Sequence, residues 1–144
     1  MSNPGEKKRV PVREGLFTTL LSPLEQVRLV GSKCHNCGEV SLGTVSSCPN
    51  CASEDLELIP LSQRGTLWTY TVIRHRPPGD YKGPDPFVPF GEGLIELLEG
   101  IQVISPIDGD VDKLKIDMEL ELVVYKLGEN EEGNDVIAFK FRPV

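Results

Sequence analysis

The second half of the chain alternates hydrophobic and polar positions with the two-residue period of β-strands. The clearest segment, RGTLWTYTVI, is rich in β-branched and aromatic residues, which favour a pleated, half-buried surface. Two apolar runs are separated only by Glu99-Gly100, a pair typical of a hairpin turn. The predicted strands are residues 64–73, 94–98, 101–104, 119–125 and 136–141.

Five short strands without a convincing helical segment predict a mainly β fold, with a small closed barrel of the OB type. A two-sheet sandwich is the competing architecture. We expect three parts along the chain: an N-terminal arm over residues 1–25, a metal-bound ribbon over 26–59, and the barrel over 60–144.

The N-terminal arm has one apolar piece, at residues 16–21, which predicts one or two helical turns before Ser22-Pro23. Pro4, Pro11 and Gly15 interrupt the segment before it. A short apolar element without a core of its own docks on something else. Packing on the chain's own ribbon and docking on a partner are equally compatible with the sequence.

All four cysteines fall within 18 residues, as the two CxxC pairs Cys34–Cys37 and Cys48–Cys51. Two such knuckles bring four thiolates together, which satisfies tetrahedral zinc and leaves no open coordination position. Gly38 directly after the first pair can adopt the positive φ that the turn requires. Iron is the other metal option, and a disulfide pair or a redox CxxC are the alternatives without a metal.

The predicted ribbon is too short to bury much of a hydrophobic core. Metal binding is therefore expected to contribute most of its folding free energy, on the order of 10 kcal/mol. With four protein ligands the metal has a structural role and activates no substrate. His35 lies inside the first knuckle but is not needed as a ligand.

Residues 74–93 form a long connection with five prolines and four glycines. Long loops without secondary structure in compact domains are usually functional or disordered. Aromatic side chains on a proline-stiffened loop indicate a surface that a ligand or partner covers, and a loop folded back over the barrel mouth is the alternative. The candidate contact residues are Arg74, His75, Arg76, Tyr81, Lys82, Phe87 and Phe90.

Charge and composition exclude several classes of function. The 144 residues carry a net charge of −7, and residues 92–135 hold 13 acidic side chains against three lysines. Such an acidic surface cannot neutralise a phosphodiester backbone, so nucleic acid is a poor partner. No apolar run approaches the roughly 18 residues of a membrane span, and the start MSNPGEKKRV has charge without the apolar core of a secretory signal behind it. These features predict a cytoplasmic protein with no membrane partner. No catalytic fingerprint is found.

Five motifs together resemble the thiolase-associated family of rubredoxin-like zinc-ribbon and OB-fold proteins. Members of that family resemble non-catalytic subunits that bind thiolases, sterol-carrier-type aldolases or hydroxymethylglutaryl-CoA synthases. The resemblance implies zinc at the four cysteines and an OB-like domain associated with acyl-CoA. The motifs are GSKCHNCG (31–38), CPNC (48–51), RGTLWTYTVI (64–73), PFVPFGEGLIEL (86–97) and FRP (141–143).

One segment departs from the family. After the first knuckle its members tend to have aromatic and proline residues, whereas this chain has Val40-Ser41-Leu42-Gly43, so contacts at that hairpin tip are in question. Phe87 to Gly93 would lie at the entry of a barrel strand, near a partner or acyl-CoA.

The resemblance thus implies a non-catalytic, zinc-binding subunit of a hetero-oligomer that makes or breaks carbon–carbon bonds in acyl-CoA thioesters. Coenzyme A is a possible shared ligand, and its phosphates would need cations. Candidates are Arg74, Arg76 and Lys82 on the loop, with residues 7–9 of the arm as a second cluster. The alternatives are a free-standing acyl-CoA-binding protein and a single-stranded nucleic-acid-binding ribbon/OB protein.

Overall fold

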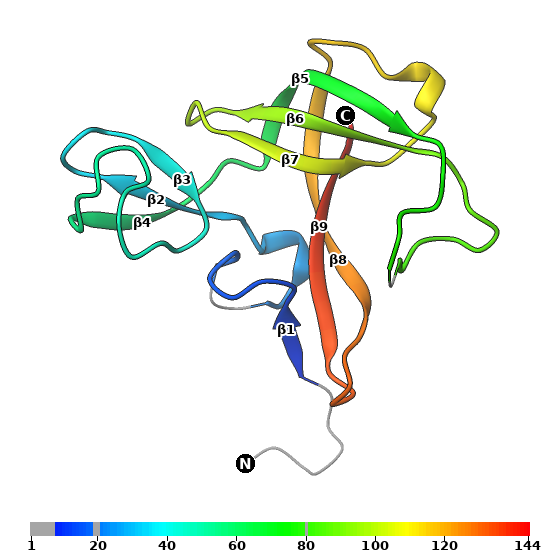
Figure 1. The fold of residues 1–144 in the computed structure, drawn as a ribbon, viewed down its shortest axis with the longest axis horizontal. Helices are drawn as coiled ribbons and strands as arrows, with labels where there is room; N and C mark the ends of the chain where they lie inside the picture. Colours follow the sequence, from blue (N-terminus) through cyan, green and yellow to red (C-terminus); the bar gives the residue numbers. More distant parts are fainter. Residues whose placement is uncertain (1–7, 19–20, 80) are drawn as a thin grey trace.

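The computed structural model describes residues 8–18, 21–79 and 81–144, and its regular elements are almost all β-strands (Figure 1). Its larger sheet closes on itself. The strands follow the order β9-β7-β6-β5-β8, and β8 pairs with β9 again, so five strands form a closed barrel. The predicted barrel is therefore confirmed over the competing sandwich. Its strands are β5 (Arg64–Ile73), β6 (Phe90–Leu97), β7 (Gln102–Ile107), β8 (Glu119–Glu129) and β9 (Asp135–Pro143).

Alternate residues of these strands point into the barrel, because successive side chains of a strand face opposite sides. Phe141, Leu120, Ile95 and Leu67 are completely buried there, and the last two face each other in the β5–β6 register. The turn at Glu99-Gly100 forms as predicted, with Gly100 at φ +84°. The barrel core is thus built from the apolar positions that the strand pattern marks.

The β8–β9 hairpin extends beyond the barrel, and a strand that the sequence did not predict lies along it (Figure 1). This strand, β1 (Arg9–Pro11), runs parallel to β9, with Arg9 opposite Asp135. The Val12 amide continues the pairing by donating to the Ile137 carbonyl at 2.8 Å. The first described residues are therefore part of the larger sheet.

The short helix predicted for residues 16–21 is not seen where the structure describes them, and Lys7 and residues 19–20 lie outside the described residues. Phe17 instead forms a bridge with Leu29, and Leu16 and Phe17 are buried in the core. The Phe17 ring also packs edge-on against Phe139. Long-range pairing overrides the helical tendency of a six-residue segment, which has little helical stability of its own. These two side chains are packed within the chain, so they are not free anchors for a partner. A single 3-10 turn, η1, follows at Leu24–Gln26.

The cysteine-rich region forms a separate three-stranded antiparallel sheet in the order β3-β2-β4. Its strands are β2 (Val30–Cys34), β3 (Val40–Leu42) and β4 (Leu56–Pro60). The buried Ser32 hydroxyl donates to the Gly43 carbonyl at 2.7 Å and ties the sheet to the loop that follows β3. The division of the chain after residues 25 and 59 stays a prediction.

The proline-rich connection is shorter than the sequence indicated, because β6 begins at Phe90 and pairs that residue with Ile73 of β5. A second 3-10 turn, η2 (Val111–Lys113), joins β7 to β8, and the Asp110 carboxylate caps it by accepting from the Asp112 amide. Among the described residues, no helix is both long enough and apolar enough to cross a membrane.

Candidate metal centre

Two knuckles with matching backbone hydrogen bonds position the four cysteines. In the first, the Gly38 amide donates to the Cys34 carbonyl at 3.0 Å; in the second, the Ala52 amide donates to the Cys48 carbonyl at 2.8 Å. The residue after each CxxC pair has a positive φ, +80° at Gly38 and +65° at Ala52. Glycine adopts this conformation without strain, whereas alanine adopts it rarely.

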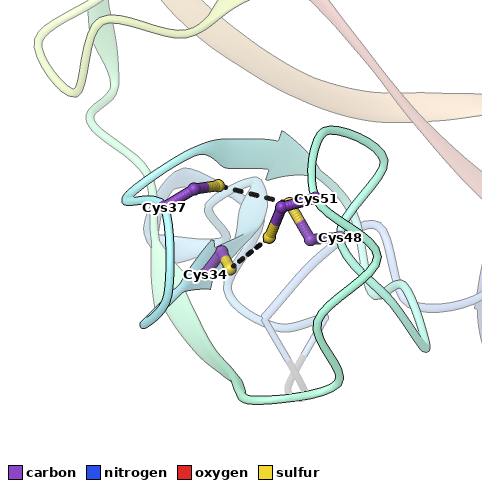
Figure 2. Close-up of side chains that lie close together, drawn as sticks. All are labelled: Cys34, Cys37, Cys48 and Cys51. Carbon is purple, nitrogen blue, oxygen red and sulfur yellow. Dashed lines mark hydrogen bonds between the residues drawn. The ribbon is translucent and has the colours of Figure 1, made fainter.

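The four sulfur atoms all lie within 4.8 Å of one another (Figure 2). Cys34 and Cys51 are separated by 3.5 Å and Cys37 and Cys48 by 3.6 Å, Sγ to Sγ. These separations exceed the ~2.05 Å of a disulfide bond, so the thiols are free. A tetrahedron with metal–sulfur bonds of ~2.3 Å has sulfur separations of roughly 3.8 Å, which this cluster approaches. The residues present therefore fit a single metal ion.

In each knuckle, the side-chain amide of an asparagine donates a hydrogen bond to a cysteine sulfur of the other knuckle. Asn36 Nδ2 lies 3.4 Å from Cys51 Sγ, and Asn50 Nδ2 lies 3.5 Å from Cys37 Sγ. These hydrogen bonds favour the thiolate, and they are the largest cause of the lowered pKa of Cys51 and of Cys37. The two asparagines thus stabilise negative charge on the two cysteines nearest the surface.

The two buried cysteines differ in their acidity. The Cys37 backbone amide hydrogen bond lowers the pKa of Cys34. The Cys51 backbone amide acts in the same direction on Cys48, but burial and the thiols of Cys37 and Cys51 outweigh it and raise the pKa of Cys48 to about 11. A cation at the centre of the cluster would favour the thiolate form of all four.

His35 lies beside the cluster but belongs to an ion-pair network. Its Nδ1 is 3.0 Å from Asp55 Oδ1 and its Nε2 is 3.4 Å from Glu57 Oε2. Both ring nitrogens are therefore engaged, and these hydrogen bonds raise the pKa of His35. Consistent with the sequence analysis, the four cysteines complete the site without it.

The predicted loop residues lie at the other end of the barrel from the cysteines (Figure 1). Tyr81, Phe87 and Phe90 form one aromatic cluster, with ring centroids 5.8 to 6.2 Å apart. The Arg76 guanidinium lies 5.6 Å from the centre of the Tyr81 ring. Arg74 and His75 are exposed and directly precede Arg76 in the chain. The structure thus gathers the predicted aromatic residues but separates them from the metal centre.

A hollow of about 660 Å³ lies between this loop and strands β7, β8 and β9. Lys82 and Phe90 line it, together with Tyr125, Lys126 and Lys140, which sequence reasoning missed. Lys140 Nζ is 4.4 Å from the centre of the Tyr125 ring and 2.8 Å from Asp108 Oδ2. Burial, with a smaller contribution from Asp108, raises the pKa of Tyr125. The hollow therefore combines aromatic faces with ammonium groups.

Comparisons with known proteins match both parts of the chain. Residues 22–57 match the rubredoxin-like zinc ribbon domain of ChsH2, and residues 58–125 match its C-terminal OB-fold domain. The benzoylsuccinyl-CoA thiolase subunit BbsA of Thauera aromatica is 29% identical, over 81% of this chain and 76% of that protein. A DUF35 domain-containing scaffold protein of Pyrococcus furiosus is 34% identical, over 83% and 86%. The solved Ltp2-ChsH2(DUF35) aldolase superposes with a TM-score of 0.61, at 28% identity over 81% of this chain and 84% of that one.

Proposed function

The chain belongs to the family that joins a ChsH2-type zinc ribbon to an OB-fold domain, and we propose that it is the non-catalytic subunit of an acyl-CoA thiolase-type complex. The observation that carries this proposal is the complete use of its cysteines. The sequence contains four cysteines, and all four converge on one candidate metal site. Relatives matched over most of their length are named as a thiolase subunit and a scaffold protein.

The metal in this proposal is zinc, one per chain, held by Cys34, Cys37, Cys48 and Cys51. Support comes from the sulfur separations and from the match to a rubredoxin-like zinc ribbon. When bound, zinc supplies structural cross-linking and no open position for a substrate. The chain's own residues hold the knuckles together through Asn36 and Asn50.

Catalytic groups would then come from another polypeptide. Claisen chemistry on a thioester uses a nucleophile activated by a nearby base. A thiolate that ligates a metal is not free for that role, and His75 is exposed on the proline-rich loop. In this proposal the chain is the supporting subunit, and a thiolase-like partner is the catalytic subunit.

Acyl-CoA contact is the finer part of the proposal. The loop offers Arg74, Arg76 and Lys82 for phosphates, and the aromatic cluster offers apolar faces for the acyl or pantetheine part. Benzoylsuccinyl-CoA, in anaerobic toluene degradation, is the specific substrate we propose, and its support is the similarity to the Thauera aromatica subunit.

Charge reversal tests the acyl-CoA contact. Reversing Arg74 and Arg76 to glutamate should raise the KM of the assembled complex for acyl-CoA at least threefold and leave kcat similar, because phosphate attraction contributes to binding. Lys113→Glu/Lys115→Glu is the matched control, since both lysines are exposed on the segment between β7 and β8. An unchanged KM in the arginine variant would exclude the loop from acyl-CoA binding.

Copurification tests the subunit role. A tagged chain isolated from its native host should retain a thiolase-type protein in fixed stoichiometry, identified by mass spectrometry. A chain that elutes alone and binds acyl-CoA would support the free-standing carrier instead. Salt-sensitive binding to single-stranded DNA would support the nucleic-acid alternative.

A further inference from the structure

The outer face of the sheet formed by β5, β6 and β7 carries large apolar side chains outside the barrel core. On β6, Ile95 and Leu97 point into the barrel and are buried. Leu94 precedes Ile95 and therefore faces outward, and it is not part of the core cluster. Its cross-strand neighbours are Thr69 on β5 and Ile104 on β7.

A bulge in β5 adds the chain's single tryptophan to this face. The register steps from Leu67 opposite Ile95 to Thr69 opposite Leu94, so Trp68 is the extra residue. Trp68 is 54% exposed and Ile104 is 65% exposed. We call Trp68, Leu94 and Ile104 the outer stripe. Apolar side chains that gather at a surface in this way mark interaction sites.

Carboxylates flank the outer stripe on both sides. Glu92 and Glu96 lie two residues before and two residues after Leu94, so they share its face and stand roughly 13 Å apart along β6. Neither forms an ion pair with any residue that the structure describes. Their cross-strand neighbours are all uncharged: Thr71, Pro106, Thr66 and Gln102.

We propose that the outer stripe docks a protein surface with an apolar centre flanked by lysine or arginine side chains. The inference rests on the proposed function, because that protein is the thiolase-type catalytic subunit. Trp68 is the central anchor, since exposed aromatic side chains that become buried carry a large share of interface energy. Glu92 and Glu96 fix the register of the partner's cations and attract them at a distance.

Charge complementarity selects this occupant over others. A second copy of the chain, stacked on the same face about a twofold axis, would bring the carboxylates of the two copies together without cations between them. Phosphodiester strands would be repelled for the same reason. A partner surface with cations about 13 Å apart on either side of an apolar centre would pair with Glu92 and Glu96 and also cover the outer stripe.

A fluorine label on the single tryptophan reports on this face directly. The chain is labelled with 5-fluorotryptophan and mixed with the unlabelled thiolase-type subunit identified by copurification. Binding should shift and broaden the one ¹⁹F resonance and reduce its accessibility to solvent. An unperturbed ¹⁹F resonance in a complex that has formed would place Trp68 outside the interface and overturn the proposal.

Two variants measure the contribution of the stripe and of its flanks. Ile104→Asp should raise the Kd at least tenfold, and its matched control is Ile116→Asp, because Ile116 is 52% exposed elsewhere on the chain. Glu92→Lys/Glu96→Lys should raise the Kd at least tenfold at low salt, with a smaller effect at high salt. Zinc content and circular dichroism verify that each variant is folded.

The outcomes separate this inference from the proposed function. If the wild-type chain binds and both variants keep its affinity, the outer stripe is not the interface and the subunit role stands. If the wild-type chain does not bind any thiolase-type subunit, the proposed function fails and the interface with it. Dimerisation of the chain alone that Ile104→Asp abolishes would assign the face to a second copy and overturn the proposal.

Discussion

Replacing Cys48 with serine should unfold the ribbon and leave the barrel folded. The change removes one of four ligands from the only cluster of potential metal ligands found among the described residues. Serine is a poor ligand for a thiophilic metal, so the site should release its ion. The barrel does not depend on this site, because its core is built from side chains such as Phe141 and Leu120.

The size of the effect follows from what is buried in the ribbon. Within the three-stranded sheet and its knuckles, residues 30–60, all of which the structure describes, the buried apolar side chains are Val30, Cys34 and Cys48, and the two cysteines are candidate metal ligands; the buried Val27 and Leu29 precede this sheet. Burying one valine contributes ~1.5–3 kcal/mol, whereas metal binding in zinc-finger peptides contributes on the order of 10 kcal/mol. Metal binding therefore contributes several times more free energy than the buried valine, and hydrophobic burial in the ribbon cannot compensate for its loss.

Amide hydrogen exchange measures this residue by residue. In Cys48→Ser, the amides of β2, β3 and β4 should lose protection, and the amides of β5 to β9 should keep it. Ser47→Ala is the matched control, because this neighbouring side chain is exposed and makes no contribution to the cluster. Full protection of the ribbon in a metal-free protein would refute the reasoning.

Two further predictions concern the barrel and the knuckles. Gly93→Ala should lower the free energy of unfolding by about 1–3 kcal/mol, since a Cβ there would lie 2.7 Å from the Thr69 carbonyl oxygen. Gly128→Ala should change it little in the same denaturant titration, because a Cβ there would meet only the Lys82 side chain, at an ordinary contact distance of 3.9 Å. Asn36→Ala should make the metal dissociate at a higher pH, because losing the Asn36 hydrogen bond raises the pKa of Cys51 and protons then compete better with the metal for the sulfur. A chelator titration against pH measures this, and an unchanged midpoint would contradict it.

Local sequence patterns were sufficient to predict much of the barrel. The strand at Arg64–Ile73 has the predicted bounds, because β-branched and aromatic residues alternate along it. The β6 strand begins earlier than predicted, since its glycines and Glu92 carry little strand signal but pair with β5. Strand β1 and the bridge at Phe17 depend on partners more than ten residues away, which a local pattern cannot indicate.

The sequence also predicted one part of the candidate site and not the rest. The spacing of the cysteines predicted the cluster, because a CxxC knuckle is a local structure. The asparagine in the third position of both knuckles was a visible signal, but its role depends on how the two knuckles face each other. Tyr125 and Lys140 join the loop only through the closure of the barrel, so their place in the hollow could not be read from the sequence.

Reconstitution tests the central claim most directly. The chain, its thiolase-type partner and the mixture of both are assayed for acyl-CoA cleavage under identical conditions. The account predicts no cleavage by the chain alone and full activity only in the mixture, because every cysteine of the chain is assigned to the metal centre. Cleavage by the chain alone at the rate of the mixture would contradict it.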